Sequence, residues 1–164
     1  MLMSRKWVVD ASPVILLAKI GRPDLLSACA EEVLIPAVVA EEIRQGEEGD
    51  PARKWIETDG APFVTSTGSV ASQVAAWDLG RGESRVLSYG YRHDEWTAVV
   101  DDGAARRCAE GLDISVIGTL GVLVVGKKIG RLENVRPLVG ALREAGLHVD
   151  DAVVDTVLRM VGEA

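Results

Sequence analysis

The sequence predicts an α/β fold with a central, mainly parallel sheet that helices cover on both faces. Short apolar runs alternate with helix-like segments along all 164 residues, which is the pattern of parallel strands joined by crossover helices. Several of these runs are apolar throughout, as expected of strands buried on both faces. No repeat, low-complexity tract or linker interrupts the pattern, so residues 1–164 are expected to form a single domain.

Five short runs are expected to be strands. Two of them, near residues 7 and 97, are continuous apolar or β-branched runs that stop abruptly at an aspartate. The run near residue 63 is so short that it could be a loop instead. In chain order the runs are Trp7–Val9, Val33–Ile35, Phe63–Val64, Thr97–Val100 and Ile114–Ile117.

The helices between these runs are predicted from capping residues and helix breakers. Ser12 followed by Pro13 is a typical helix start, with the serine as N-cap and the proline at the first helical position. Asp50 followed by Pro51 repeats this pattern, and Gly80 separates two helices. In chain order, helices are expected over Pro13–Ile20, Pro23–Ala30, Pro36–Arg44, from Asp50-Pro51 past Trp55, Ser69–Asp78, Arg81–Arg92, from Asp102 to Glu110, Thr119–Ile129, Val135–Ala145 and Asp150–Val161.

The composition is that of an ordinary globular protein, with 48% hydrophobic and 26% charged residues. No apolar run approaches the ~20 residues that a membrane-spanning helix needs, and the N-terminal residues lack the pattern of a secretory signal. Cys29 and Cys108 lie in helix-like apolar stretches and are expected to be buried thiols. This cysteine usage predicts a reducing, cytoplasmic location.

Charge and ligand content narrow the function. The net charge of −7 disfavours a broad nucleic-acid-binding surface. Basic residues are nevertheless concentrated in the second half of the chain, where a locally positive surface could accept RNA. The two cysteines and the two histidines, His93 and His148, are too far apart to build a zinc cluster.

Aspartates directly follow two of the predicted strands. Asp10 ends the first apolar run, and Asp101 and Asp102 follow Thr97–Val100. The carboxyl ends of strands in open α/β sheets face the crevice where such folds place their chemistry. For Asp102, a helix N-cap is at least as good an explanation as a metal ligand. For Asp101 that explanation is weaker, because a cap is available next to it.

Two glutamates are predicted to lie on the apolar faces of helices. At ~100° per residue, Glu42 projects between Val38 and Val39. Glu83 projects into the apolar face that holds Val86 and Leu87. An ionised carboxylate on a core-facing stripe is costly unless it is paired or binds a metal. The alternative is that each glutamate reaches water at the end of its helix or pairs with an arginine.

These four acids would repel one another if they met without a counter-charge. A hard divalent cation, Mg²⁺ or Mn²⁺, supplies that charge and prefers oxygen ligands. An all-carboxylate site of this kind most naturally serves phosphoryl chemistry.

Four segments in order resemble PIN-domain proteins, above all the VapC-like branch of bacterial and archaeal proteins. They are DASPVILLAKIG, VLIPAVVAEEI, LGRGESRVLSYG and VVDDGAARRCAEGLDISVIGTLGVL. The resemblance runs from about Trp7 to Gly162. It implies an α/β/α sandwich and a Mg²⁺/Mn²⁺-dependent endoribonuclease acting on RNA. Such a protein is often the toxin of a toxin–antitoxin pair, so the implied partners are a cognate antitoxin and a second copy of the chain.

The resemblance also assigns roles to residues. The family's catalytic, metal-binding acids correspond to Asp10, Glu42, Glu83 and Asp101. Asp102 is a further candidate ligand beside the last of them, where many VapC-like chains carry Thr-x-Asp and this one has Val-Asp-Asp. Three residues are candidates for substrate binding. Arg106 could face phosphate or brace the acids, and the hydroxyls of Ser12 and Thr119 could hold water or phosphate unless they cap helices.

Other interpretations are less well supported. Residues 121–128, GVLVVGKK, nearly match a phosphate-binding P-loop, but a lysine stands where that motif needs a Mg²⁺-binding serine or threonine. The main alternative function is a catalytically silent PIN-like module that binds a partner protein or RNA. The complete set of acids argues against it, because a scaffold does not need carboxylates on apolar helix faces.

Overall fold

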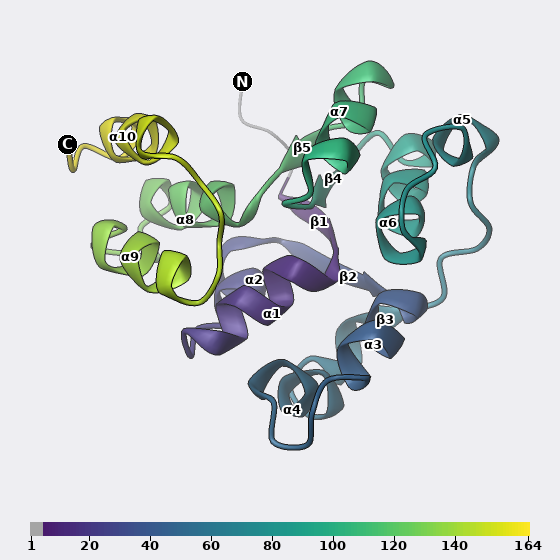
Figure 1. The fold of residues 1–164 in the computed structure, drawn as a ribbon, viewed down its shortest axis with the longest axis horizontal. Coiled ribbons are helices and arrows are strands. Elements are labelled where there is room, and N and C mark those ends of the chain that lie inside the picture. The colour runs from purple at the N-terminus through teal and green to yellow at the C-terminus, as the bar shows by residue number, and fades with distance from the viewer. Residues whose placement is uncertain (1–4) are drawn as a thin grey trace.

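A computed structural model describes residues 5–164. Its centre is a five-stranded sheet in the order β3-β2-β1-β4-β5, and all four pairs of neighbouring strands are parallel (Figure 1). The strands are β1 (Lys6–Val9), β2 (Glu32–Pro36), β3 (Val64–Thr65), β4 (Trp96–Val99) and β5 (Val116–Ile117). The α/β fold with a parallel sheet is therefore confirmed, and each of the five predicted runs contributes to a strand.

Helices flank this sheet. They are α1 (Ala11–Lys19), α2 (Leu25–Cys29), α3 (Ala37–Arg44), α4 (Pro51–Glu57), α5 (Ser72–Ala75), α6 (Arg81–Arg92), α7 (Gly103–Gly111), α8 (Thr119–Lys128), α9 (Arg136–Glu144) and α10 (Asp151–Met160), with one 3₁₀ turn, η1 (Ala61–Phe63). Helix α6 packs on β1, β2 and β4, whereas α8 contacts α1, α2, β5 and α10. In Figure 1 the last three helices gather on the left and α5, α6 and α7 on the right.

Several helix starts differ from the sequence prediction, and those of α1 and α5 bear on neighbouring residues. Helix α1 begins at Ala11, with Asp10 in the N-cap position, so Ser12 is not the N-cap. Helix α5 covers only Ser72–Ala75 of the predicted Ser69–Asp78. Its start is delayed because the backbone N–H of Ala71 donates to the buried hydroxyl of Ser88 on α6 at 2.9 Å, which ties this segment to its neighbour.

The connections around the sheet create a switch in direction. The chain runs outward from β1 through β2 to β3, then returns to the other side of β1 for β4 and β5. In sheets of this order, the crossover helices separate where the direction reverses, which opens a crevice outside the carboxyl ends of the two central strands. Strands β1 and β4 meet at this point, and Val9 pairs with Val99.

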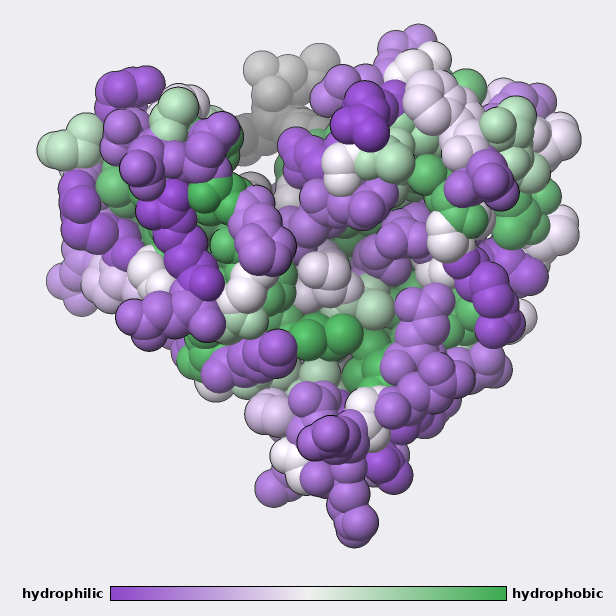
Figure 2. Space-filling view, in the orientation of Figure 1, coloured by the Kyte–Doolittle hydropathy of each residue, from purple (hydrophilic) through white to green (hydrophobic). Residues whose placement is uncertain are grey.

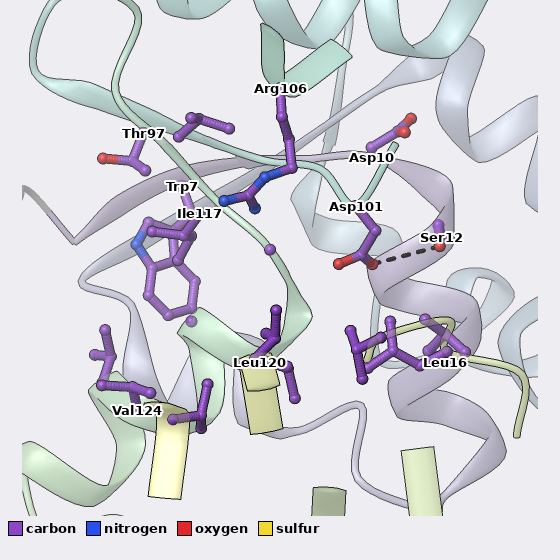
Figure 3. A pocket seen from close by; sticks show the side chains of 18 of the residues that line it. Trp7, Asp10, Ser12, Leu16, Thr97, Asp101, Arg106, Ile117, Leu120 and Val124 are labelled. Atoms are coloured by element: carbon purple, nitrogen blue, oxygen red, sulfur yellow. Dashed lines mark hydrogen bonds between the residues drawn. The ribbon is translucent and has the colours of Figure 1, made fainter. Parts of the chain in front are cut away.

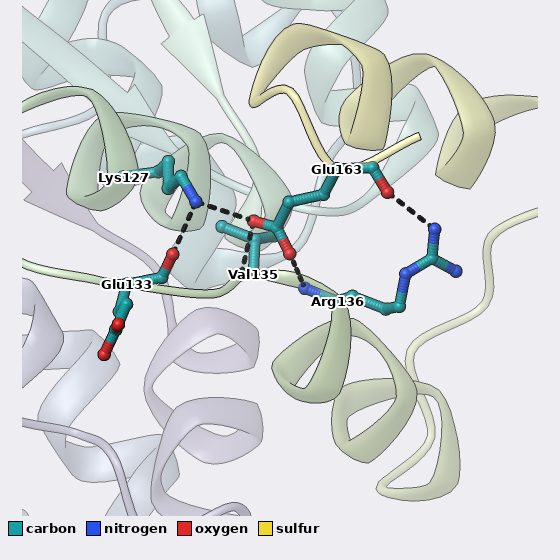
Figure 4. A network of polar contacts seen from close by, with 5 residues as sticks. All are labelled: Lys127, Glu133, Val135, Arg136 and Glu163. Atoms are coloured by element: carbon teal, nitrogen blue, oxygen red, sulfur yellow. Dashed lines mark hydrogen bonds and ion pairs between the residues drawn. The ribbon is translucent and has the colours of Figure 1, made fainter.

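The end of the chain is fastened to helices α8 and α9 through Glu163 (Figure 4). Its carboxylate accepts hydrogen bonds from the backbone N–H groups of Val135 and Arg136, at 2.7 and 3.0 Å, and pairs with Lys127 at 3.3 Å. The guanidinium of Arg136 donates to the backbone carbonyl of Glu163. The two backbone hydrogen bonds, together with Lys127, lower the pKa of Glu163 below its ordinary value.

We expect Glu163→Gln to lower the melting temperature at neutral pH, because the amide loses the charge that these donors stabilise. A carboxyl group whose pKa is lowered by folding stabilises the protein above its unfolded pKa of about 4.5 and loses that contribution as pH falls through the folded value. The difference from wild type should therefore be present at pH 7 and shrink below pH 4.5, as measured by thermal unfolding. Glu144→Gln, an exposed change on α9, is the control; equal melting of wild type and Glu163→Gln at pH 7 would contradict the expectation.

Candidate active site

Three strands of the sheet end side by side at the crevice. The N–H of Asp10 donates to the carbonyl of Val99, and the N–H of Val100 donates to that of Ile117, at 3.0 and 2.9 Å. Asp10 thus follows β1 beside the end of β4, and Asp101 follows β4 beside the end of β5. The prediction that the strand-end acids share one edge of the sheet is confirmed.

Asp10 is the most deeply buried of the acids. Only 4% of the surface of Asp10 is exposed. The pKa of its carboxyl is raised from 3.8 to about 7, mainly by burial; a hydrogen bond from the backbone of Ala11 opposes this rise, and the negative charges of Glu83, Glu42 and Asp101 contribute to it. The negative charges of all three other predicted acids therefore act on the carboxyl group of Asp10, so the four acids form one electrostatic cluster.

Glu42 reaches the cluster from helix α3, although not from the core. The buried face of α3 consists of Val39, Ala40 and Ile43, whereas Glu42 is exposed. The prediction that Glu42 lies on a core-facing stripe is therefore wrong, because α3 is covered on one side only. Its carboxylate lies instead against Gly82 on α6.

Gly82 brings two of the carboxylates together. A Cβ atom at this position would lie 2.8 Å from Oε1 of Glu42 and 3.0 Å from Oδ1 of Asp10. With no side chain at residue 82, helix α6 approaches both acids without displacing their carboxylates. Sequence reasoning missed this residue, although the glycine directly before Glu83 was a visible signal.

Glu83 is half-buried in the first turn of α6. Desolvation raises the pKa of its carboxyl, and the charges of Asp102 and Glu42 add to the effect, while hydrogen bonds from the backbone of Glu83 and Gly80 oppose it. Glu83 therefore belongs to the cluster and at the same time turns toward the start of its own helix.

Asp101 is held by the start of helix α8. The backbone N–H of Thr119 donates to its Oδ1 at 2.8 Å, and the hydroxyl of Thr119 donates to Oδ2 at 2.6 Å. The hydroxyl of Ser12 donates to the same Oδ2 at 3.4 Å (Figure 3). Neither hydroxyl caps its helix, so the capping explanation for Ser12 and Thr119 is wrong: both hydroxyls serve an acid that is distant in sequence.

Asp102 has a structural role as well as a place at the site. Its side chain accepts a hydrogen bond from the N–H of Ala105 at 2.9 Å, so it is the N-cap of α7 as the helix-cap explanation predicts. Its charge nevertheless raises the pKa of Glu83, and it lines the same pocket as Asp101.

Four of the five predicted acids, Asp10, Glu83, Asp101 and Asp102, line a pocket of about 890 Å³, and Glu42 does not. Asp10 and Asp101 lie at one end of it, and the aliphatic side chains of Leu16, Leu120 and Val124 lie away from that end (Figure 3). Figure 2 shows hydrophobic surface in a hollow near the middle of the molecule, between more hydrophilic regions. The pocket thus joins a charged end to an apolar wall.

Two basic side chains on this pocket have no acidic partner among the residues described. Arg106 projects into it and donates only to the carbonyl of Val100, at 3.5 Å. Lys128 on α8, one of the basic residues of the second half of the chain, is exposed at its edge, although it was not predicted as a site residue. The third basic residue, Arg5, is already engaged with Glu31 at 3.5 Å.

The chemistry of the acids fits a hard divalent cation. No lysine or arginine within residues 5–164 forms an ion pair with any of the five predicted acids. Their donors are carboxylate oxygens, the ligands that Mg²⁺ and Mn²⁺ prefer. Over the same range, no three Asp, Glu, His or Cys side chains already form a metal-binding group. Glu83 points to its own helix start, so a cation would require some of the carboxylates to turn toward it.

A family model described as a PIN domain matches residues 6–163. The chain belongs to the PIN-domain family. The resemblance seen in the sequence is therefore confirmed at the level of the family. PIN domains are generally nucleases and typically use divalent metal ions. The parallel five-stranded sheet between helices is the fold expected of a PIN domain. Searches of curated proteins and of solved structures found no significant match to this PIN domain.

No helix in residues 5–164 is long and apolar enough to cross a membrane.

Proposed function

We propose that this PIN domain is a Mg²⁺- or Mn²⁺-dependent endoribonuclease that hydrolyses RNA phosphodiester bonds. The observation that carries the proposal is a set of carboxylates without basic partners, gathered where β1 and β4 end. Beside them lies a pocket with two basic side chains, Arg106 and Lys128, that form no ion pair with an acid among the residues described. Asp10, Glu42, Glu83 and Asp101 would hold the metal, with Asp102 next to them. When bound, the metal supplies Lewis-acid activation of water and neutralises charge at the phosphate.

The protein's own groups bind and orient the substrate. The guanidinium of Arg106 is planar and permanently charged, so it suits bidentate binding of a phosphate beside the acids. Lys128 provides a second positive charge at the edge of the pocket for a neighbouring phosphate. The aliphatic wall formed by residues such as Leu120 and Val124 excludes water on one side and strengthens these charge interactions.

The VapC-like sequence segments support a finer proposal. We propose that the protein is the toxin of a toxin–antitoxin pair, that it binds a cognate antitoxin, that it forms a homodimer and that it acts in the cytoplasm. Ser12 and Thr119, first considered as substrate contacts, donate to Asp101 instead, so Arg106 is the remaining candidate of that group for direct contact with RNA.

Adjacent glutamates on α3 provide a direct test. We expect Glu42→Gln to lower Mn²⁺-dependent cleavage of an RNA panel by at least about 100-fold, because loss of a direct ligand should exceed the ~10–100-fold typical of outer-shell changes. Glu41→Gln should leave cleavage unchanged, since Glu41 is also exposed but lies 4.0 Å from Arg81 and is not among the charges that act on Asp10. Cleavage is measured with Mn²⁺, with Mg²⁺ and with excess EDTA.

The silent-module alternative predicts a different outcome. A module that only binds a partner would show no Mn²⁺ binding that depends on these carboxylates. Two results together would overturn the nuclease proposal. The first is equal Mn²⁺ affinity of wild type, Glu42→Gln and Glu83→Gln in calorimetry, and the second is an RNA cleavage assay that gives the same result with Mn²⁺ as with EDTA.

A further inference from the structure

The carboxylate of Asp101 is unlike the other acids, because one residue holds both of its oxygens. Thr119 contributes its backbone N–H to Oδ1 and its hydroxyl to Oδ2, and Thr119 itself is completely buried. The hydroxyl distance of 2.6 Å lies in the range of short, charge-assisted hydrogen bonds. Ser12 adds a longer contact of 3.4 Å to Oδ2.

We propose that Thr119 is a positioning residue that fixes the orientation of Asp101 for metal binding, and that it makes no contact with RNA. This inference rests on the proposed function, in which Asp101 is a metal ligand. A side chain with no exposed surface cannot reach a substrate in the pocket, whereas it can set the plane of the carboxylate in front of it.

The arrangement leaves Asp101 able to bind a cation. An ionised carboxylate has about four lone-pair sites, and Thr119 and Ser12 occupy three of them. Both Thr119 donors belong to the first residue of α8, so the position of the helix relative to β4 fixes the direction of the carboxylate. Outer-shell partners of this kind typically contribute ~10–100-fold to metal affinity or activity.

Gly118 provides an independent observation that this position is built around Asp101. A Cβ atom on Gly118 would lie 2.8 Å from Oδ1 of Asp101 and 2.8 Å from Nη1 of Arg106. The backbone of Gly118 has φ −103° and ψ −173°, which any residue can adopt. A side chain at this position would therefore displace the end of Asp101 or of Arg106, whereas the backbone conformation itself does not call for a glycine.

The test compares Thr119→Val with Thr119→Ser. Valine keeps the shape and the backbone N–H but removes the hydroxyl, whereas serine keeps the hydroxyl. We expect Thr119→Val to weaken Mn²⁺ binding ~10–100-fold in calorimetry and to lower kcat, with KM for RNA unchanged. Thr119→Ser should restore most of the affinity. Thermal unfolding in EDTA checks that both variants fold.

Gly118→Ala keeps the position testable if the threonine variants unfold. It should weaken Mn²⁺ binding with Thr119 intact, because the methyl group displaces the Asp101 carboxylate. Unchanged Mn²⁺ affinity in Thr119→Val or Gly118→Ala, or a raised KM with normal affinity in Thr119→Val, would overturn the inference. Failure of the proposed function looks different: wild type itself would bind no Mn²⁺, or Asp10→Asn would bind it as tightly as wild type, and the positioning role would fall with it.

Discussion

Asp10→Asn is expected to abolish metal-dependent cleavage and to stabilise the metal-free protein. Loss of activity, by at least about 100-fold, follows if Asp10 is the ligand at the centre of the cluster. The gain in stability follows from its environment. Asp10 is buried, and its ionised form is also repelled by Glu83, Glu42 and Asp101. Asparagine fills the same space without a charge.

The sign of the pH dependence is fixed by the raised pKa of Asp10. Folding raises this pKa from 3.8 to about 7, so the wild-type protein loses stability as pH rises through that window. The asparagine variant has no such loss. At about 1.4 kcal/mol per pKa unit, the variant should gain at most about 4 kcal/mol in unfolding free energy at pH 8, and clearly less at pH 5.

The measurement is thermal or urea unfolding in EDTA at both pH values, followed by the same experiment with Mn²⁺. Metal should raise the stability of wild type, by about 2.7 kcal/mol at 100 times its Kd, and should leave Asp10→Asn nearly unchanged. A variant that is less stable than wild type in EDTA at pH 8 would show that the charge of Asp10 is already compensated inside the protein.

Gly82→Ala is expected to reduce activity at least about 10-fold without reducing stability. Alanine favours a helix over glycine by about 1 kcal/mol. Its methyl group, however, would press on the carboxylates of Glu42 and Asp10, at 2.8 and 3.0 Å. Those two side chains must then move apart, which changes the donor positions available to a metal. The readouts are kcat on RNA, Mn²⁺ affinity and melting temperature.

Gly140→Ala is the matched control for this substitution. Gly140 also lies in a helix, α9, but a Cβ atom there would have no neighbour within 4 Å. This substitution should likewise not reduce stability, and it should leave cleavage unchanged. If Gly82→Ala retained full activity alongside this control, the present spacing of Glu42 and Asp10 would not matter for catalysis.

The strand-end acids could be predicted from the sequence because their placement follows from local rules. A buried parallel strand is a continuous apolar run, and the residue after it must lie at the carboxyl edge of the sheet. Asp10 and Asp101 therefore needed no knowledge of distant neighbours. The boundaries of α6, Arg81–Arg92, were also predicted as the structure has them, because Gly80 precedes the helix and an apolar face runs through it.

The remaining parts of the site depend on which segments meet in space. Helical angles place Glu42 relative to Val39, but they do not tell how far α6 covers α3, so its exposure was mispredicted. The hydroxyls of Ser12 and Thr119 have nearby helix ends as plausible partners, and only the pairing of β4 with β5 shows that Asp101 takes them. Gly82 and Gly118 matter because neither has a Cβ atom that would press on a neighbouring carboxylate. A single sequence does not show which side chains lie next to a glycine.

The position of β1 in the middle of the sheet has a consequence for biosynthesis. The first strand made carries Asp10, but its neighbour on one side is β4, and Asp101 is oriented by residues that follow β5. A growing chain on the ribosome therefore holds its first carboxylate long before the partners of that carboxylate exist. The proposed metal centre can form only when most of the polypeptide has been translated, so incomplete products of its own gene would carry no assembled centre.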